Sequence, residues 1–150
     1  MGGKARVPRR LRERVARTAG NRCGYCRTPE SIAGFRLTIE HIVPEARGGQ
    51  TVEKNLWLAC HACNEFKGDR TQGQDPATGK RVRLWNPRRQ KWPDHFSWSE
   101  DGTEIIGLTP RGRATVATLH LNRPELVAAR SLWVQVGWWP PRESDRGYSS

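Results

Sequence analysis

Apolar residues recur every four positions near the start of the chain. Leu11, Val15 and Ala19 stand at positions i, i+4 and i+8, which lie on one face of an α-helix. Pro8 suits the first helical turn, and Gly20 suits a left-handed stop after the last turn. The pattern predicts a helix from about Pro8 to Ala19, with a narrow apolar face and arginines that point partly outward.

Two short apolar runs follow and predict strands. The first spans about residues 35–42 and ends before Pro44, and the second spans residues 55–60. The second run is too short for periodicity to exclude a helical turn. The polar, lysine-bearing sequence from about 62 to 69 predicts a short helix, so the central order is strand, loop, strand, helix. Residues 71–83 are rich in Gly, Gln and Pro, which predicts a mobile linker.

A hairpin is the strongest local signal in the C-terminal part. Residues 96–99 and 103–108 carry aromatic and β-branched side chains, which favour strands. They flank Asp101-Gly102, a pair typical of tight hairpin turns.

Two helices are predicted after this hairpin. Thr109 followed by Pro110 indicates a capped helix that runs to about residue 119. A last helix should begin near Asn122, which forms a capping box with Glu125. Its predicted buried face consists of Leu126, Val127, Ala129, Leu132, Trp133 and Val136. Six tryptophans are interpreted as core or clamp residues rather than base-stacking platforms: Trp85, Trp92, Trp98, Trp133, Trp138 and Trp139.

The composition shows how little apolar material is available for a core. Hydrophobic residues make up 35% of the 150 residues, with 15 Gly and 10 Pro. This predicts a loop-rich α+β chain whose local order needs a metal. No apolar run approaches the roughly 20 residues that cross a bilayer, and the first residues lack the apolar centre of a signal peptide. We therefore expect a cytoplasmic protein without a membrane partner.

The net charge of +11 is unevenly distributed over four expected segments. Lys and Arg outnumber acidic residues by eight to one in a basic N-terminal helix (1–22) and by six to one in a basic linker (71–93). A core at 23–70 balances six against six, and an extension at 94–150, expected to pack on the core, has six basic and seven acidic residues. The basic arms favour a polyanion, because each neutralised phosphate releases counterions. A solvated basic surface is the alternative interpretation.

All four cysteines stand in two pairs, Cys23-x-x-Cys26 and Cys60-x-x-Cys63. Each pair can give two thiolates to one tetrahedral zinc ion, so the two pairs predict a closed, structural site. The 33 residues between Cys26 and Cys60 exceed the usual ribbon spacing, so the site must close a long loop. A redox role is the alternative, although the chain lacks the βαβ pattern of thioredoxin-like proteins. His61, inside the second pair, is interpreted as part of the knuckle.

Glu40 and His41 are neighbours in the first predicted strand, inside the long loop. Phosphodiester hydrolysis needs a base that activates water and a cation that stabilises the leaving oxygen. Histidine suits the first task near neutral pH, while carboxylate and amide oxygens are hard ligands for Mg²⁺. Strand neighbours point to opposite faces, so both side chains reach one site only if the chain bends before Pro44. Taken alone, the pair fits a structural histidine better.

A longer pattern joins the cysteine pairs to Glu40 and His41. It reads Cys23-x-x-Cys26, Ile39-Glu40-His41-Ile42-x-Pro44, Gly48-Gly49 and Asn55-Leu56-x-Leu58-x-Cys60-x-x-Cys63-Asn64-x-x-Lys67-Gly68. The pattern covers about residues 23–68 and resembles the zinc-bound, four-cysteine branch of the HNH endonuclease family. The resemblance implies a ββα-metal core, also called the His-Me finger, one catalytic divalent cation and cleavage of a nucleic-acid phosphodiester.

The resemblance also implies a role for each matching residue. His41 matches the general base that activates water, and Glu40 matches the acidic metal ligand before it. Asn64 stands in place of the final His of the family name and would supply the second ligand of the catalytic ion. Asn55 matches the central Asn, which braces the loop by hydrogen bonds and so orients the histidine. Lys67 stands where a phosphate contact fits, as does a solvated lysine.

We therefore expect a divalent-metal-dependent endonuclease that acts on DNA. Zinc would be structural, and Mg²⁺ or another divalent ion would be catalytic. Besides Lys67, the predicted phosphate contacts are Arg9, Arg10, Arg14 and Arg17. One alternative is a zinc-ordered nucleic-acid-binding module that does not cleave, and another is a redox-responsive interaction protein. Strandedness of the substrate, DNA against RNA, and oligomeric state stay open at this point.

Overall fold

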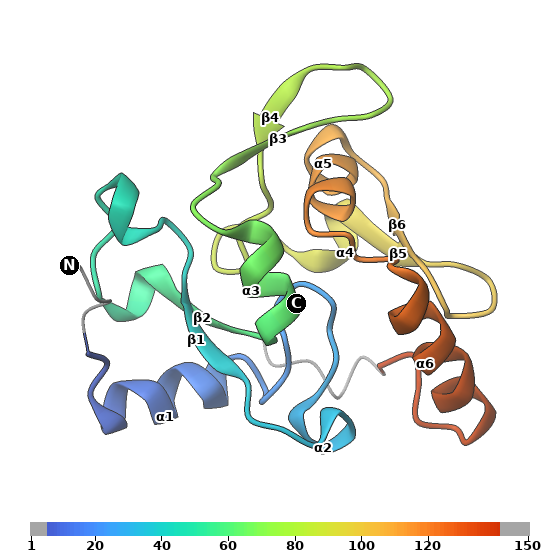
Figure 1. Cartoon of the computed structure of the whole chain (residues 1–150), viewed down its shortest axis with the longest axis horizontal. Helices are drawn as coiled ribbons and strands as arrows, with labels where there is room; N and C mark the ends of the chain where they lie inside the picture. Colours follow the sequence, from blue (N-terminus) through green and yellow to red (C-terminus); the bar gives the residue numbers. More distant parts are fainter. Residues whose placement is uncertain (1–5, 142–150) are drawn as a thin grey trace. The chain divides into compact units, whose positions relative to one another are not determined.

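The computed structural model describes residues 6–141, which fall into two compact units, residues 6–71 and residues 72–141 (Figure 1). The first unit contains α1 (Arg9–Thr18), α2 (Glu30–Ala33), β1 (Thr38–His41), β2 (Leu56–Ala59) and α3 (His61–Lys67), with 3-10 helices at Glu45–Arg47 and Glu53–Asn55. The second contains β3 (Gln72–Gln74), β4 (Arg81–Arg83), α4 (Trp92–His95), β5 (Phe96–Trp98), β6 (Ile105–Gly107), α5 (Pro110–Thr118) and α6 (Pro124–Gln135).

The mixed α+β class predicted from the sequence is confirmed. Each pair of strands forms its own two-stranded antiparallel sheet. Within residues 6–141, no helix combines the length and the apolar character needed to cross a bilayer. The boundaries of the four expected segments, and the packing of the last on the core, stay predictions; the ends of the first and last segments lie outside the described residues.

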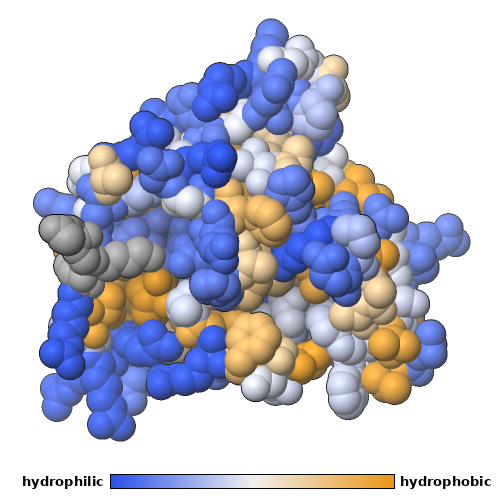
Figure 2. Space-filling view, viewed as in Figure 1, coloured by the Kyte–Doolittle hydropathy of each residue, from blue (hydrophilic) through white to orange (hydrophobic). Residues whose placement is uncertain are grey.

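The first helix forms as predicted. α1 begins directly after Pro8, and its apolar face is closed by Val15 and Ala19, both buried. This face packs on β1 and β2, while Gly20 adopts a φ of 67° after the last turn. The remaining faces of α1 carry most of the arginines, and Figure 2 shows hydrophilic side chains gathered over this helix at the lower left.

β1 and β2 form the centre of the first unit. In their antiparallel pairing, Glu40 lies opposite Trp57 and His41 lies opposite Leu56. All four residues of β2 and the last three of β1 are buried. α3 begins two residues after β2 ends, which confirms the predicted order of strand, loop, strand and helix. The designation ββα-metal requires a catalytic ion and stays a prediction.

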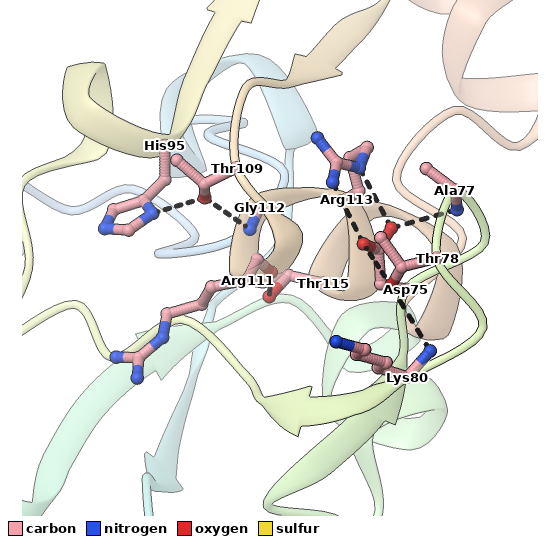
Figure 3. A network of polar contacts seen from close by, with 10 residues as sticks. All are labelled: Asp75, Ala77, Thr78, Lys80, His95, Thr109, Arg111, Gly112, Arg113 and Thr115. Atoms are coloured by element: carbon pink, nitrogen blue, oxygen red, sulfur yellow. Dashed lines mark hydrogen bonds and ion pairs between the residues drawn. The ribbon is translucent and has the colours of Figure 1, made fainter.

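The predicted mobile linker at residues 71–83 is wrong, because β3 and β4 pair there as an antiparallel hairpin. The turn is held by Asp75, whose carboxylate accepts hydrogen bonds from the Ala77 N–H and the Thr78 hydroxyl. The same carboxylate accepts two hydrogen bonds of 2.9 Å from the Arg113 guanidinium of α5 (Figure 3). Arg113 lies 38 residues away in sequence, so local composition does not reveal this pairing.

The predicted hairpin around Asp101 is confirmed, with a longer loop than a two-residue turn. Trp98 on β5 lies opposite Ile105 on β6, and the residues between them form the loop. The Asp101 carboxylate accepts hydrogen bonds from the hydroxyls of Ser99 and Thr103 and from the Thr103 N–H. A side-chain network therefore closes this loop.

The two C-terminal helices begin differently. α5 is capped as predicted, since the Thr109 hydroxyl accepts a hydrogen bond from the Gly112 N–H. The capping box predicted at Asn122 is wrong, because this side chain is used elsewhere. Its amide oxygen accepts from the Ile105 N–H, and its amide nitrogen donates to the Ile105 carbonyl. α6 consequently starts at Pro124 without a side-chain cap.

The buried face predicted for the last helix is only partly correct. Leu132 and Val136 are 62% and 60% exposed, whereas the fully buried side chain of α6 is Arg130. Its guanidinium lies over the rings of Trp98 and Trp139, 5.6 and 5.8 Å from the ring centres. Aromatic faces attract a cation, so an arginine takes the central place here.

Aromatic side chains fill the core of the second unit. Trp85, Trp92 and Trp139 are buried, and the rings of Trp85 and Trp92 both contact Phe96. The core interpretation is confirmed for these three tryptophans. It is wrong for Trp138, which is 61% exposed. The other two are half-buried: Trp98 and Trp133.

Candidate active site

The four cysteines form a metal-binding cluster. Their sulfur atoms lie within 4.8 Å of one another, and all four residues are buried and free of disulfides. Tetrahedral zinc with Zn–S bonds of about 2.3 Å spaces its sulfurs about 3.8 Å apart, and the sulfurs of Cys26 and Cys60 are 3.8 Å apart. Burial raises the pKa of the Cys23 thiol well above its usual range, whereas the hydrogen bond with Cys23 lowers the pKa of the Cys26 and Cys60 thiols. The donor set therefore fits a closed tetrahedral metal site.

Gly24 allows the first cysteine pair to lie against the sheet. A Cβ atom at this position would collide with the indole ring of Trp57 on β2. The Gly24 N–H also donates to the Leu58 carbonyl, over 2.9 Å. The first knuckle is thus tied to β2, which leads directly into Cys60. The cysteine cluster consequently holds both ends of the long segment between Cys26 and Cys60 at the same sheet.

His41 ends β1, and only 6% of its surface is exposed. Its Nε2 lies 2.9 Å from the Thr51 hydroxyl oxygen, in a hydrogen bond whose donor depends on the ring tautomer. Among residues 6–141, the buried Nδ1 has no hydrogen-bond partner. Leaving a buried polar atom unpaired costs about 1–3 kcal/mol. One ring nitrogen is therefore fixed, and the other is left for a water molecule or a ligand.

The loop between β1 and β2 is braced by Asn55. Its amide oxygen accepts a hydrogen bond from the Val43 N–H, and its amide nitrogen donates to the carbonyls of Val43 and Gln50. A Cβ atom at Gly49 would collide with the Val43 carbonyl, so the loop requires glycine there. These bonds are the bracing contacts expected of Asn55, and they hold the segment that carries Thr51.

Glu40 points to the face of β1 opposite His41, and it is 1% exposed. The Tyr25 hydroxyl donates to one carboxylate oxygen over 2.7 Å, and the Lys67 ammonium lies 2.7 Å from the other. The same ammonium donates to the backbone carbonyls of His41 and Ile42, over 3.2 and 2.8 Å. The ammonium therefore combines two hydrogen bonds to backbone carbonyls with an ion pair to the carboxylate.

This arrangement changes the roles of two predicted site residues. Glu40 does not fit an open ligand for a catalytic cation, because both of its oxygens are engaged and one of them faces an ammonium. Lys67 does not fit a phosphate contact, because it is 2% exposed and points inward from α3. A buried ion pair persists where further hydrogen bonds offset the desolvation of both charges. Tyr25 and the two backbone carbonyls supply those bonds.

Comparison with protein families matches residues 23–76 to the HNH endonuclease family. The matched range contains both cysteine pairs, β1, the braced loop, β2 and α3. The chain carries an HNH endonuclease domain. The resemblance inferred from the spacing of the motif is thereby confirmed. Comparisons with curated proteins and with solved structures give no match.

Within the HNH domain, Asn64 lies on α3, one helical turn before Lys67. Its backbone N–H donates to the Cys60 carbonyl, and its carbonyl accepts from the Gly68 N–H. The half-buried side chain is the part that remains for a ligand. Apart from the cysteines, residues 6–141 contain no group of three or more His, Cys, Asp and Glu close enough to hold a metal ion. The ligand role of Asn64 stays a prediction.

Three other residues of the HNH domain differ in how far the sequence indicates their role. His61 is exposed and pairs with Glu65 across one helical turn, with 2.8 Å between Nε2 and Oε2. Tyr25 stands between two metal-binding cysteines, a position that indicates a side chain near the centre of the domain. Thr51 carries no comparable signal, because its contact with His41 follows from the shape of the loop.

The arginines predicted to contact phosphate are exposed on α1: Arg9, Arg10, Arg14 and Arg17. Two of them have acidic neighbours. Arg14 Nε lies 3.0 Å from Glu53 Oε1, and Arg9 Nε lies 3.8 Å from Glu13 Oε2. Ion pairs this exposed contribute about 0–1 kcal/mol, so they leave the arginines available to an anion. Their contact with nucleic acid stays a prediction.

Proposed function

We propose that this protein hydrolyses phosphodiester bonds of DNA, with His41 as the general base. The observation that carries the proposal is the fixed imidazole of His41 in an HNH endonuclease domain, bonded to Thr51 in a loop that Asn55 braces. The family supports a nucleic-acid substrate, and the net charge of +11 supports a polyanion. A cytoplasmic location and DNA as the substrate belong to the same proposal.

In the proposed reaction, His41 takes a proton from water while the water oxygen forms a bond to phosphorus. The bond between phosphorus and the 3′ oxygen breaks, and that oxygen takes a proton from solvent. The products carry a 5′ phosphate and a 3′ hydroxyl, as the family resemblance implies. Thr51 holds the plane of the ring, so the unpaired nitrogen keeps one direction. A positioned base of this kind contributes about 10²–10⁴-fold in rate.

Lys67, Glu40 and Tyr25 have a positioning role in this proposal. The Lys67 ammonium donates to the carbonyls of His41 and Ile42, so it fixes the backbone from which the imidazole projects. Glu40 balances the ammonium charge in the buried interior, and Tyr25 orients the carboxylate. None of the three is expected to touch the substrate.

The proposal assigns a structural role to one metal and a catalytic role to the other. The cysteine cluster would hold zinc, which links the two knuckles and supplies no open position for chemistry. A catalytic divalent ion, Mg²⁺ in the first place, is predicted on Glu40 and Asn64. Because Glu40 is paired with Lys67, it does not fit this ion, and no step above is routed through it. The requirement for a divalent ion stays a prediction that chelation tests.

A cleavage panel tests the function. Supercoiled plasmid, linear duplex, single strand and RNA are incubated with the parent, His41→Ala and His61→Ala, in Mg²⁺, in Mn²⁺ and in excess EDTA. We expect the parent and His61→Ala to cut DNA, and His41→Ala to be at least about 100-fold slower with unchanged zinc content. His61 is a matched control, because it is an exposed histidine on α3. Equal cutting by His41→Ala would remove the assignment of the base.

A second candidate is a zinc-ordered nucleic-acid-binding module that does not cleave. The Glu40–Lys67 pair favours it, because the carboxylate that the family resemblance assigns to the catalytic ion is already occupied. This candidate predicts salt-dependent DNA binding without nicking in Mg²⁺ or Mn²⁺. Cutting by the parent that His41→Ala loses would exclude it.

A further inference from the structure

A cleft of about 520 Å³ opens beside α1, formed entirely by residues of the first unit. Four arginines line it, three from α1 and one from the segment before β1: Arg9, Arg12, Arg17 and Arg36. Two glutamates line it as well: Glu13 from α1 and Glu30 from α2. The cleft is hereafter called the arginine cleft.

Both glutamates of the arginine cleft are already engaged. The Glu30 carboxylate accepts a hydrogen bond from the Leu37 N–H over 2.8 Å. The Glu13 carboxylate lies 3.8 Å from the guanidinium of Arg9, one turn earlier on α1. Their negative charge is therefore partly satisfied within the wall of the cleft, and a ligand meets mainly the arginines.

The arginines are held differently. Arg12 donates to the Leu37 carbonyl over 2.9 Å, which fixes its guanidinium at the wall. Neither Arg17 nor Arg36 forms an ion pair within residues 6–141. One fixed cation therefore lies beside two cations whose donors remain for a ligand.

The structure separates the α1 arginines into two groups, although the sequence predicts the same phosphate contacts for both. Arg9 and Arg17, eight residues apart, both line the arginine cleft. Arg10 and Arg14 do not line it, and Arg14 turns to Glu53, whose carboxylate accepts its hydrogen bond over 3.0 Å. The two groups therefore differ in position and not in chemistry.

We propose that the arginine cleft binds the phosphodiester backbone of nucleic acid. This rests on the proposed function and names the surface that holds the substrate of the HNH domain. Guanidinium groups match phosphate oxygens in geometry as well as in charge. The apolar lining is limited to Ala16 and the buried Leu58, so the cleft offers no platform for stacked bases and no side chain for a lipid bilayer. Binding should therefore depend little on base sequence.

Binding of a short DNA duplex, followed by fluorescence anisotropy at increasing salt, tests the proposal. All proteins carry His41→Ala so that the duplex stays intact. Arg17→Ala with Arg36→Ala is compared with Lys54→Ala with Arg70→Ala, an exposed pair of the same unit outside the cleft, which removes the same charge. The cleft pair should reduce the slope of log affinity against log salt by about 2 and weaken binding several-fold. The control pair should leave both close to the parent values.

Equal losses in both pairs, or no loss in the cleft pair, would overturn the proposal in favour of diffuse surface charge. Stronger competition by anionic phospholipid vesicles than by duplex DNA would overturn it as well. Zinc content and the midpoint of thermal unfolding check that each variant folds. Cleft-dependent binding without cleavage by the parent contradicts the proposed function alone. Cleavage by the parent with unchanged binding of the cleft pair contradicts the arginine cleft alone.

Discussion

The two units are stabilised by different means. Buried ionisable groups occupy the centre of the first unit: Glu40, His41, Lys67 and the four cysteines. Buried aromatic rings occupy the centre of the second: Trp85, Trp92, Phe96 and Trp139. Apolar burial stabilises in proportion to area and needs no counter-charge, whereas buried thiolates and carboxylates need one. We therefore expect the first unit to depend on a metal ion, whereas the buried cation of the second unit, Arg130, lies among aromatic rings that attract it.

The largest effect should come from the cysteine cluster. Cys60→Ser removes one of four metal ligands, and structural zinc contributes about 10–16 kcal/mol in small zinc domains. Because native proteins are stable by only about 5–15 kcal/mol, we expect the first unit to unfold. The tryptophan-rich core of the second unit should stay ordered. Amide hydrogen exchange followed by NMR measures both units in the same sample.

Chelation of the parent is the control for this prediction. Removing zinc should release the same amides of the first unit as Cys60→Ser, and zinc should restore protection in the parent but not in the variant. Protected amides in β1 and β2 after complete metal removal would show that the sheet does not depend on the cluster. Loss of protection in β5 and β6 would show that the two units do not differ as described.

The Lys67 ammonium gives the next effect. Lys67→Met leaves Glu40 buried without its cation, and breaking a buried ion pair from one side costs about 3–5 kcal/mol. We expect the urea midpoint of the zinc-loaded protein to fall accordingly. Lys54→Met, at an exposed lysine of the same unit, should change stability by no more than about 0.5 kcal/mol.

The double variant Glu40→Gln with Lys67→Met distinguishes a charge effect from a packing effect. Removing both charges should recover part of the loss, because no uncompensated charge stays buried. A double variant as unstable as Lys67→Met alone would assign the loss to packing. Slower cleavage by the double variant at restored stability would support the positioning of His41 by Lys67.

The sequence predicts most of the elements, because helix and strand patterns are local. α1, β1, β2, α3, the β5–β6 hairpin and α5 all lie close to their predicted positions. The β3–β4 hairpin is missed because its turn is held by Arg113, 38 residues away. Asn122 has the right spacing for a cap, yet it bonds to Ile105, which lies 17 residues earlier. Periodicity does not register such long-range pairings.

In the candidate site too, some features follow from local sequence spacing and others depend on long-range packing. The cysteine cluster and the bracing by Asn55 follow from spacings that the family match supports. The environment of Glu40 does not follow from spacing, because strand alternation tells only that it faces away from His41. What meets it there, Lys67 and Tyr25, is decided by the packing of α3 and the first knuckle.

The smallest effect concerns a carboxylate–cation pair in the second unit. Asp75 accepts hydrogen bonds from Arg113, and this pairing holds the pKa of the Asp75 carboxyl well below its usual range. A depressed pKa contributes stability above the unfolded value, about 3.9, and this contribution is lost as pH falls through the folded pKa. Asp75→Asn should therefore lower the midpoint of thermal unfolding at neutral pH, and the gap to the parent should close below about pH 4.

The pH profile of Asp75→Asn distinguishes the ion pair from the turn that the same side chain forms. In the parent, the midpoint of thermal unfolding should fall as acid protonates Asp75, and this fall is called the acid limb. If the hydrogen bonds to Ala77 and Thr78 alone stabilise the hairpin, Arg113→Ala should leave the acid limb at the same pH. If the guanidinium is the main partner, Arg113→Ala should shift that limb to higher pH, toward the unfolded pKa of the carboxyl. Glu100→Gln, at an exposed carboxylate of the same unit, should reproduce neither change. A gap between parent and Asp75→Asn that stays constant with pH would show that charge has no part in ordering the hairpin.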